Sequence, residues 1–251
     1  MTRYRKPVSS RKNRSCKHKE EMRRIKDIII LLLAVTAASV QAGGAEFAVP
    51  DFDAIERETR DFDSQYYYPR MMDRYLGGDT AFTDKELTYL YYGYTYQEDY
   101  DPYRDVKYHT SEVDGIYNKE GHTPAECDTI IKYARLVLDD FPFEFRQMNM
   151  LSYAYAQKGD MQKSAFWNTR MRRLLNVILR TGDGLNPETA WYVISSVHEY
   201  DIIYCLGLLP AGYTFVEPMY DFIDIKPGSG KKEEGYYFNV SRMLSEYYRK
   251  Q

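Results

Sequence analysis

Residue types and motifs on which many enzymes and metal sites depend are scarce or absent in this sequence. Its 251 residues include only 4 histidines and 3 cysteines, and His109, His122 and His198 do not have the close spacing of zinc ligands. The chain has no Gly-x-Ser-x-Gly elbow, no phosphate-binding loop and no dinucleotide-binding fingerprint. We therefore predict no cofactor, no metal centre of the zinc type and no catalytic residues of these kinds.

A long apolar run is also missing. The apolar stretch at residues 28–35 is too short to anchor a protein stably in a bilayer. It follows a basic flank and precedes small residues, with Val40 and Ala42 at the two positions that a signal peptidase reads. This order predicts a signal peptide at residues 1–42. An ordinary buried helix at the N-terminus is the alternative.

Export follows from this prediction. Met22, directly before the basic flank, is a better start for a signal peptide than Met1. No cysteine follows the small residues, which argues against a lipid anchor. We predict that the mature chain, from Gly43, is soluble in the periplasm or outside the cell and has no membrane span.

Basic side chains are in short supply in the predicted mature chain. Residues 1–42 contain 11 of the 34 Lys and Arg residues but only 3 of the 37 Asp and Glu residues. The remaining 209 residues therefore carry 23 basic and 34 acidic side chains, a net charge of −11. Such a chain repels phosphate backbones, so we predict that nucleic acid is not a partner.

Two cysteines, Cys127 and Cys205, remain in the predicted mature chain. Export would permit a disulfide between them. Because both lie in apolar helical patterns, two buried thiols are favoured over a disulfide, and their pairing stays open.

Tyrosine is abundant, with 26 residues, of which 12 lie between Tyr66 and Tyr108. Thr83 and Glu86 have the spacing of a capping box and predict the start of a helix. Two sets of residues then recur at helical spacing: Leu87, Leu90, Tyr91 and Tyr94 in one, Tyr89, Tyr92 and Tyr96 in the other. A helix with two aromatic faces must be covered over most of its circumference, and Gly93 would let a neighbouring element approach closely.

The end of this helix carries candidate binding residues: Tyr92, Tyr96, Glu98, Asp99, Tyr100 and Asp101. Tyrosine supplies contact area and a hydroxyl with little loss of rotamer freedom, which suits a peptide or glycan ligand. Two carboxylates held apart could also cleave a glycoside as general acid and base. The structural alternative is that the acids form a solvated face and the tyrosines fill the core.

Residues 123–180 show three helical patterns, separated at Pro142 and Gly159. Thr123 can cap the first pattern, and Glu126 can close a capping box with it. This part of the chain resembles the tetratricopeptide repeat over residues 125–176, through Leu151, Ala154, Tyr155, Gly159, Asp160 and Ser164. The resemblance implies antiparallel helix pairs that pack side by side.

A turn with two glycines and a proline follows at residues 181–188. It contains three side chains with oxygen donors at short spacing: Asp183, Asn186 and Glu188. A calcium loop needs about six oxygen ligands, so these three are weak candidates for a cation site. Glycines in a turn after a long helix relieve a Cβ clash. We interpret the turn as a joint between two parts of the fold.

The hydrophobic period changes after this turn. Residues 191–197 alternate as a strand does, and residues 198–206 return to helical spacing. Residues 220–225 and 235–240 are further strand candidates, and Ser241 can cap a last amphipathic helix.

These patterns predict an α+β fold, mainly antiparallel helix pairs with a small C-terminal antiparallel β-sheet. Residues 43–251 would form a single domain. Its helical part would cover about 51–180, and its mixed strand and helix part about 186–251.

The segment YYYPRMMDRYLGGDTAFTDKELTYLYYGYTYQEDYDPYRD is followed by TGDG, ETAWYVISSVHEYDIIYCLGL, YDFIDIKP and YYFNVS. With these segments the chain resembles a family of exported Bacteroidota proteins, domain of unknown function 4919. The resemblance covers nearly the entire predicted mature chain. It implies export and carries no established activity and no catalytic residues.

We predict an exported, non-enzymatic interaction or binding protein whose partner is a peptide, a glycan or an envelope protein. The alternative is a cell-envelope hydrolase acting on glycan or peptide. That alternative requires a pocket containing at least two of Glu98, Asp99, Asp101 and His109.

Overall fold

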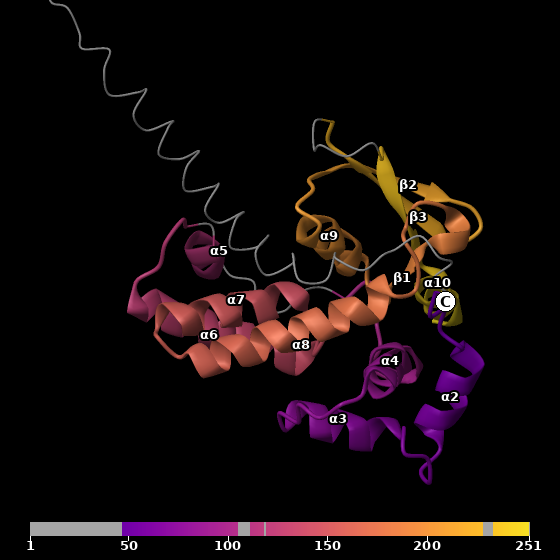
Figure 1. The fold of residues 1–251 in the computed structure, drawn as a ribbon, viewed down its shortest axis with the longest axis horizontal. Coiled ribbons are helices and arrows are strands. Elements are labelled where there is room, and N and C mark those ends of the chain that lie inside the picture. Colours follow the sequence, from indigo (N-terminus) through magenta and orange to yellow (C-terminus); the bar gives the residue numbers. More distant parts are fainter. Residues whose placement is uncertain (1–46, 105–110, 118, 228–232, 251) are drawn as a thin grey trace, which may run out of the picture. The chain divides into compact units, whose positions relative to one another are not determined.

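The computed structural model describes residues 47–104, 111–117, 119–227 and 233–250, and Figure 1 shows their helices and strands. The helices are α2 (Phe52–Arg60), α3 (Tyr68–Leu76), α4 (Asp84–Gly93), α5 (Ser111–Tyr117), α6 (Pro124–Asp140), α7 (Phe145–Gln157), α8 (Met161–Leu179), α9 (Ser196–Cys205) and α10 (Ser241–Arg249), with single 3₁₀ turns at Tyr94–Tyr96 and Pro187–Thr189. The strands are β1 (Trp191–Tyr192), β2 (Pro210–Val216), β3 (Tyr220–Ile225) and β4 (Gly235–Asn239). The predicted signal peptide, residues 1–42, lies outside the described residues.

Side-chain caps begin two of the three helices for which the sequence predicts them. The third prediction is wrong, because Ser241 is the first residue of α10 and Val240 precedes it without a side-chain cap. In α4 the Thr83 hydroxyl accepts from the Glu86 amide at 3.1 Å, and the Glu86 carboxylate accepts from the Thr83 amide at 2.7 Å. Thr123 and Glu126 form the same reciprocal pair at the start of α6. Each capping box provides partners for backbone groups that a helix end otherwise leaves unpaired.

Gly93 lets another helix approach α4 closely, as predicted. A Cβ atom at Gly93 would lie 2.7 Å from Cγ2 of Thr59, which belongs to α2. Real Cβ atoms do not come that near to another carbon, so the packing of α2 on α4 depends on a glycine here.

Helices α6, α7 and α8 pack consecutively as antiparallel neighbours. Cys127 and Ile130 of α6 meet Ala154 of α7 in one buried cluster. The Ser152 hydroxyl of α7 donates to the Ser164 carbonyl of α8 at 3.0 Å. Both contacts join residues that are about equally far from the connecting turn, which is the geometry of two helices running in opposite directions.

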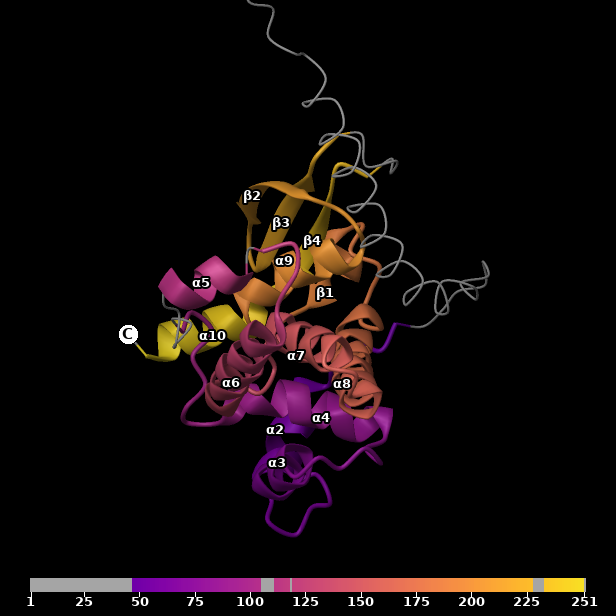
Figure 2. The same cartoon turned by 90° about the vertical axis from the view of Figure 1, so that its left-hand side faces the viewer.

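The C-terminal strands form one sheet in the order β1-β4-β3-β2. Strand β3 is antiparallel to both β2 and β4, whereas the two-residue strand β1 pairs with β4 in parallel. Helix α9 lies against one face of this sheet (Figures 1 and 2). The α+β class is confirmed, and the sheet is mixed, not wholly antiparallel, because β1 pairs with β4 in parallel.

Two sequence expectations about the strands need correction. The alternating segment at 191–197 contributes only Trp191 and Tyr192 to the sheet, and α9 begins at Ser196. Strand β2, which contains Pro210 and Gly212, is not among the predicted strands. It is an edge strand, which tolerates proline because one side of its backbone has no strand partner. The sequence patterns predict no element between residues 103 and 122, where the structure has α5.

The turn after α8 joins the helices to the sheet. The Trp191 indole N–H donates to the Gly182 carbonyl at 2.9 Å, and the Tyr237 amide donates to the Gly184 carbonyl at 2.8 Å. Gly184 has φ +70°, and a Cβ atom there would lie 2.8 Å from the Trp191 ring. The interpretation of this turn as a joint agrees with these contacts.

The described residues within 47–204 and 208–250 form one compact unit. Among the described residues, no helix is both long and apolar enough to cross a membrane. Within this part of the chain neither Cys127 nor Cys205 belongs to a disulfide. The extent of the domain, residues 43–251, stays a prediction.

Candidate functional site

The tyrosines among the predicted binding residues are used inside the protein. Tyr92 and Tyr100 are fully buried, at 0% and 1% exposed. The Tyr92 hydroxyl donates to the Tyr192 carbonyl at 3.1 Å, and the Tyr100 hydroxyl donates to the Ile194 carbonyl at 2.8 Å. Tyr92 and Tyr100 are therefore core residues and offer no surface to a ligand.

Tyr96 is half-buried and is also engaged by neighbours. Its hydroxyl donates to the Phe52 carbonyl at 3.0 Å. The guanidinium carbon of Arg242 lies 4.1 Å from the centre of its ring. Of the three predicted tyrosines, Tyr96 alone has partial access to solvent, and Arg242 covers one face of its ring.

The predicted acids Glu98, Asp99 and Asp101 are exposed. The Asp99 carboxylate accepts from the Tyr94 hydroxyl at 3.4 Å, and the Asp101 carboxylate accepts from the Tyr103 amide at 3.0 Å. His109, the fourth residue of the predicted hydrolase pocket, lies outside the described residues. A binding role for this segment therefore depends on Tyr96 and the three acids.

The three cation-site candidates lie in the joint after α8. The Asp183 carboxylate accepts from the Leu185 amide at 2.9 Å and from the Thr189 hydroxyl at 2.6 Å, so it stabilises the turn itself. Asn186 and Glu188 are exposed. Within the described ranges, no three His, Cys, Asp or Glu side chains are grouped so that they could hold a metal ion.

A different residue, Arg170 of α8, lies among aromatic rings and is a candidate ligand-binding residue. Its guanidinium carbon lies 4.1 Å from the ring centre of Tyr75, 4.5 Å from that of Phe166 and 5.3 Å from that of Trp167. One guanidinium nitrogen donates to the Tyr75 carbonyl at 2.7 Å. Burial lowers the pKa of Arg170 from its usual value, but an arginine stays charged in a protein.

Arg170 has no acidic partner within the part of the chain that the structure describes. Its one protein hydrogen bond goes to a backbone carbonyl, and the only charge effect on its pKa comes from Tyr75. A guanidinium has five N–H donors, so donors remain for another group. A half-buried cation without a counter-charge is costly unless something compensates it.

Two pockets open on either side of Arg170. The first has a volume of about 300 Å³ and lies between α8 and the loop from α3 to α4. The second has a volume of about 390 Å³ and also reaches the end of α6. Tyr75, Phe166 and Arg170 line both pockets, so these three residues form a wall between them.

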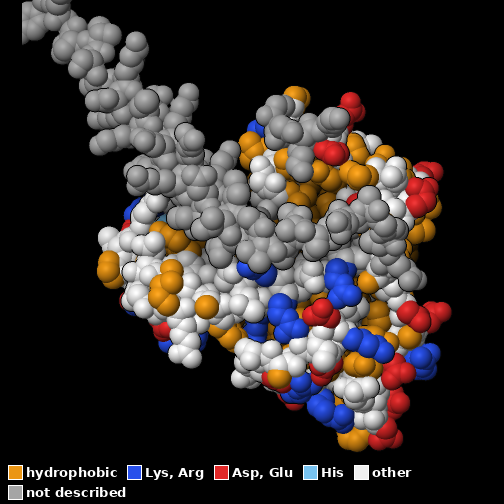
Figure 3. Space-filling view, viewed as in Figure 1, with side chains coloured by type: hydrophobic (Ala, Val, Ile, Leu, Met, Phe, Trp, Pro, Cys, Tyr) orange, Lys and Arg blue, Asp and Glu red, His pale blue; other side chains and the backbone are white. Residues whose placement is uncertain are grey.

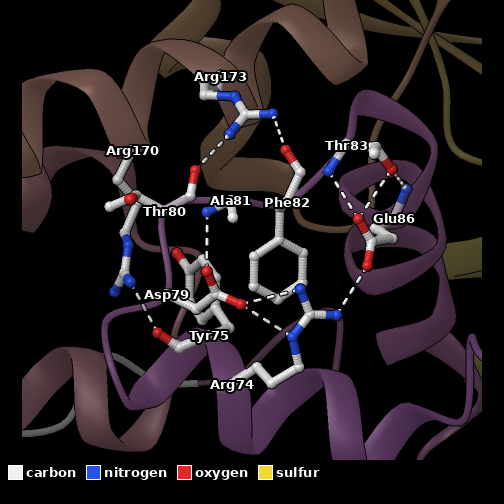
Figure 4. A network of polar contacts seen from close by, with 10 residues as sticks. All are labelled: Arg74, Tyr75, Asp79, Thr80, Ala81, Phe82, Thr83, Glu86, Arg170 and Arg173. Carbon is white, nitrogen blue, oxygen red and sulfur yellow. Dashed lines mark hydrogen bonds and ion pairs between the residues drawn. The ribbon is translucent and has the colours of Figure 1, made fainter.

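The loop that bounds the first pocket is held by other arginines, as Figure 4 shows. Arg74 forms ion pairs with Asp79 at 2.8 Å and with Glu86 at 2.7 Å, and its guanidinium carbon lies 4.5 Å from the ring centre of Phe82. Arg173 donates to the carbonyls of Thr80 and Phe82. The acids of this network are thus committed to Arg74, and none of them neutralises Arg170.

Basic side chains gather near these pockets although the predicted mature chain is acidic. Arg173 lines the first pocket, and Arg135 and Lys163 line the second. Figure 3 shows Lys and Arg side chains, with acids among them, over α3, α4 and α8. We refer to Arg170, its three aromatic neighbours and the two pockets as the Arg170 site.

A second polar cluster, between α9 and β3, is buried. Glu199 is 1% exposed and Asp221 is 7% exposed, and a hydrogen bond between their carboxyl groups raises the pKa of Glu199 and lowers that of Asp221. Two carboxylates cannot share such a bond unless one of them holds a proton. Burial, followed by the nearby charge of Asp221, raises the pKa of Glu199 well above its usual value. Glu199 is therefore the proton donor of the pair.

Asp221 accepts two bonds in this cluster. The Tyr213 hydroxyl donates to its carboxylate at 3.2 Å, in addition to the bond from Glu199. Burial raises the pKa of Asp221, and the two hydrogen bonds oppose that rise. Because the carboxyl groups are buried, we assign the Glu199–Asp221 pair to structure and not to ligand binding.

Two other titratable residues of α9 are buried. His198 is stacked on Phe141, its Nε2 bonds to the Phe143 carbonyl at 3.0 Å, and its Nδ1 bonds to the Tyr91 hydroxyl at 2.7 Å. Burial lowers its pKa to about 3, so the ring is neutral and Nδ1 accepts from Tyr91. Burial raises the pKa of Asp201 to about 7, despite an Arg146 nitrogen 3.7 Å away.

Sequence reasoning missed these residues, although local signals existed. Arg170 follows Trp167 by three residues and Phe166 by four, the spacings that bring a cation onto an aromatic ring on one helix face. Asp221 shares the strand period of Ile223 and Ile225, which marks it as a carboxylate on a buried face. The contribution of Tyr75 to the site could not be seen, because it is 95 residues away from Arg170.

Comparison with known proteins places the chain in a family. A family model described as Domain of unknown function (DUF4919) matches residues 53–249. The chain belongs to this DUF4919 family. The match includes α3, α4, α8, α9 and the sheet, so both the Arg170 site and the Glu199–Asp221 pair lie within the family domain. No curated protein and no solved structure matches the chain.

Proposed function

We propose that this DUF4919 protein is a binding protein that holds an anionic group of its ligand against Arg170. One observation carries the proposal: a half-buried guanidinium, stacked on aromatic rings, lines two pockets and has no acidic partner among the described residues. A carboxylate or phosphate would supply the missing charge and can form two parallel hydrogen bonds with a guanidinium. The aromatic walls would bury the less polar part of the same ligand.

The hydrolase alternative has less support. Its acids Glu98, Asp99 and Asp101 are exposed, and neither of the two pockets contains them. The Glu199–Asp221 pair is a true carboxyl pair, but its groups are inaccessible to a substrate. A binding role needs only the charge and shape that the Arg170 site has.

We further propose export, as the leader at residues 1–42 predicts, and an origin in Bacteroidota, as the family resemblance implies. The order of basic flank, apolar run and small residues supports export. The antiparallel packing of α6, α7 and α8 supports the likeness to tetratricopeptide repeats. Mass spectrometry of the N-terminus of the natively expressed protein is expected to begin at Gly43. Retention of residues 23–42 would contradict export by this route.

The binding proposal is tested by titration calorimetry with benzoate and its neutral analogue benzamide. We expect wild type to bind benzoate and not benzamide, and Arg170→Gln to bind benzoate at least about tenfold more weakly, since one charge-assisted hydrogen bond contributes about 1.5–3 kcal/mol. Arg170→Lys keeps the charge but loses the planar fork, so it should recover only part of the affinity.

Arg172→Gln is the matched control. Arg172 belongs to the same helix and lines neither pocket, so its loss should leave benzoate binding unchanged. Urea unfolding of each variant verifies that it is folded before affinities are compared. Equal benzoate affinities of the folded wild type, Arg170→Gln and Arg172→Gln proteins would refute the proposal.

A further inference from the structure

The two pockets of the Arg170 site are arranged for a ligand of more than one unit. They share Tyr75, Phe166 and Arg170 as a common wall. Their volumes of about 300 and 390 Å³ are similar. A single small ion would occupy one side of Arg170 and leave the other pocket unused. A chain that passes over Arg170 would use both.

Each pocket contains a second cation in addition to Arg170. Arg173 lies in the first pocket, and Lys163 and Arg135 lie in the second. Lys163 also forms an ion pair with Asp160 at 2.8 Å, and Arg173 forms one with Asp84 at 3.4 Å, so a ligand would share these two cations with acids of the protein. Lys163, Arg170 and Arg173 are spaced i, i+7 and i+10 along α8, which places them on one face of the helix. Charge complementarity therefore favours a chain that carries an anionic group in successive units.

The backbone around the first pocket has few groups left for a peptide main chain. The carbonyl of Tyr75 accepts from Arg170, and the carbonyls of Thr80 and Phe82 accept from Arg173. The Ala81 amide donates to the Asp79 carboxylate at 2.8 Å. Figure 4 shows these bonds, of which three tie this segment to Arg170 and Arg173 of α8 and one lies within the loop. An extended peptide gains much of its affinity from main-chain hydrogen bonds, and this loop does not offer them.

The side chains in the walls suit rings that carry hydroxyl groups. Phe166 lines both pockets and Trp167 lines the second, and these partly exposed rings offer apolar surface. Phe82 also lines the first pocket, but it is 4% exposed and Arg74 covers one face of its ring. Gln162 and Thr169 in the first pocket can bond to hydroxyls. Asp139 in the second pocket would repel a purely acidic ligand but can accept hydrogen bonds from a hydroxyl.

From these features we propose that the ligand of the Arg170 site is an acidic glycan, with a uronate carboxylate on Arg170 and a sugar ring in each flanking pocket. This rests on the proposed function, because it names the ligand class of the same site. Each sugar unit of such a glycan combines a ring face, hydroxyls and a carboxylate, which are the three chemistries that the walls accept.

The test compares four probes by titration calorimetry on the full mature chain: galacturonate, digalacturonate, the neutral dimethyl ester of digalacturonate, and the peptide triglutamate. We expect digalacturonate to bind at least about tenfold more tightly than galacturonate, because it fills both pockets. The neutral ester and triglutamate should bind at least about tenfold more weakly than digalacturonate.

Variants test which residues bind each of the two sugar units. Arg170→Gln should weaken both galacturonate and digalacturonate about tenfold or more. Arg135→Gln, at a residue that lines the second pocket and not the first, should remove most of the gain from monomer to dimer and leave galacturonate binding nearly unchanged. Arg172→Gln should bind all four probes as wild type does.

The outcomes separate the two proposals. If triglutamate binds more tightly than digalacturonate and Arg170→Gln loses it, the glycan assignment is overturned while anion binding at Arg170 stands. If digalacturonate binds no better than galacturonate, the two-pocket arrangement is overturned in the same way. If Arg170→Gln changes the affinity for none of the anions, including benzoate, the proposed function fails together with the glycan assignment.

Discussion

At the scale of single residues, tyrosine in this protein is mainly a core residue whose hydroxyl finds a backbone partner. Tyr75, Tyr92 and Tyr100 are at most 2% exposed, and each hydroxyl donates to a carbonyl of a segment at least 67 residues away in sequence. A buried hydroxyl without a partner would be unfavourable. These bonds therefore allow a polar-tipped side chain to fill the core and at the same time tie distant segments together.

The contribution of one such bond can be measured with Tyr92→Phe. This change removes the hydroxyl bonded to the Tyr192 carbonyl and keeps the ring. We expect urea denaturation to show a loss of about 1–2 kcal/mol in the free energy of unfolding, because the carbonyl is left unpaired in the interior. Tyr248→Phe, at a side chain 70% exposed, is the control and should change the free energy by less than about 0.5 kcal/mol. Equal effects of the two changes would contradict this account.

Gly93 provides a second test at the residue scale. In Gly93→Ala the new methyl group would lie 2.7 Å from Thr59 Cγ2. We expect the free energy of unfolding to fall by about 1–3 kcal/mol, the usual cost of overpacking a core. The control is Gly115→Ala in α5, where a Cβ atom meets nothing within 4 Å. That change should be neutral or slightly stabilising, because alanine favours helix. A neutral Gly93→Ala variant would mean that α2 moves freely on α4.

At the scale of elements, the contact of α9 with the sheet depends on a proton. The Glu199–Asp221 bond joins α9 to β3, and Tyr213 extends the cluster to β2. Because Glu199 keeps its proton in the folded state and ionises in the unfolded state, unfolding releases a proton. Its contribution to stability is thus complete below the unfolded pKa and is lost as pH rises toward the raised folded pKa.

Glu199→Gln should remove the pH dependence that Glu199 gives to the stability. Glutamine can donate to Asp221 and does not ionise, so the stability of the variant relative to wild type should increase from pH 5 to pH 9. Urea denaturation at several pH values measures this difference. Glu98→Gln, at an exposed position, is the matched control and should show no such trend. A stability difference between Glu199→Gln and wild type that stays constant with pH would contradict the assignment of the proton to Glu199.

At the scale of the whole molecule, buried groups with opposite pKa shifts determine the pH of greatest stability. His198, with a pKa lowered to about 3, stabilises the fold at neutral pH and loses that contribution as pH falls from about 6.5 toward 3. Asp201, with a pKa raised to about 7, contributes most at low pH and loses that contribution as pH rises from about 4 to 7. Their effects oppose each other between pH 4 and 6.5.

Above pH 6.5 the opposition ends, because His198 no longer titrates in either state. The raised carboxyls Asp201 and Glu199 then lower the stability as pH increases. We expect the free energy of unfolding to fall from pH 6 to pH 8. Urea denaturation at these two pH values checks the fall, and Asp201→Asn should reduce it. A stability that rises steadily to pH 8 would contradict these shifts.

Much of the fold could be predicted from neighbouring residues. The capping boxes at Thr83 and Thr123, the close approach at Gly93 and the strands after residue 219 all depend on interactions over a few positions. The site could not be predicted in the same way. Tyr92 and Glu98 carry equally clear local signals, yet one is in the core and the other is in solvent, because only the packing of α4 on its neighbours decides which face is covered.

The sequence by itself determined the α+β class, the family and the starts of the capped helices, since caps, periods and motifs are local properties of the chain. Only the tertiary structure decided that Tyr75 and Arg170, 95 positions apart, would stack between two pockets, and that Glu199 and Asp221 would share a proton. The physical reason is that distance and burial determine which groups a charged side chain interacts with. Distance and burial are in turn set when the helices and the sheet pack together.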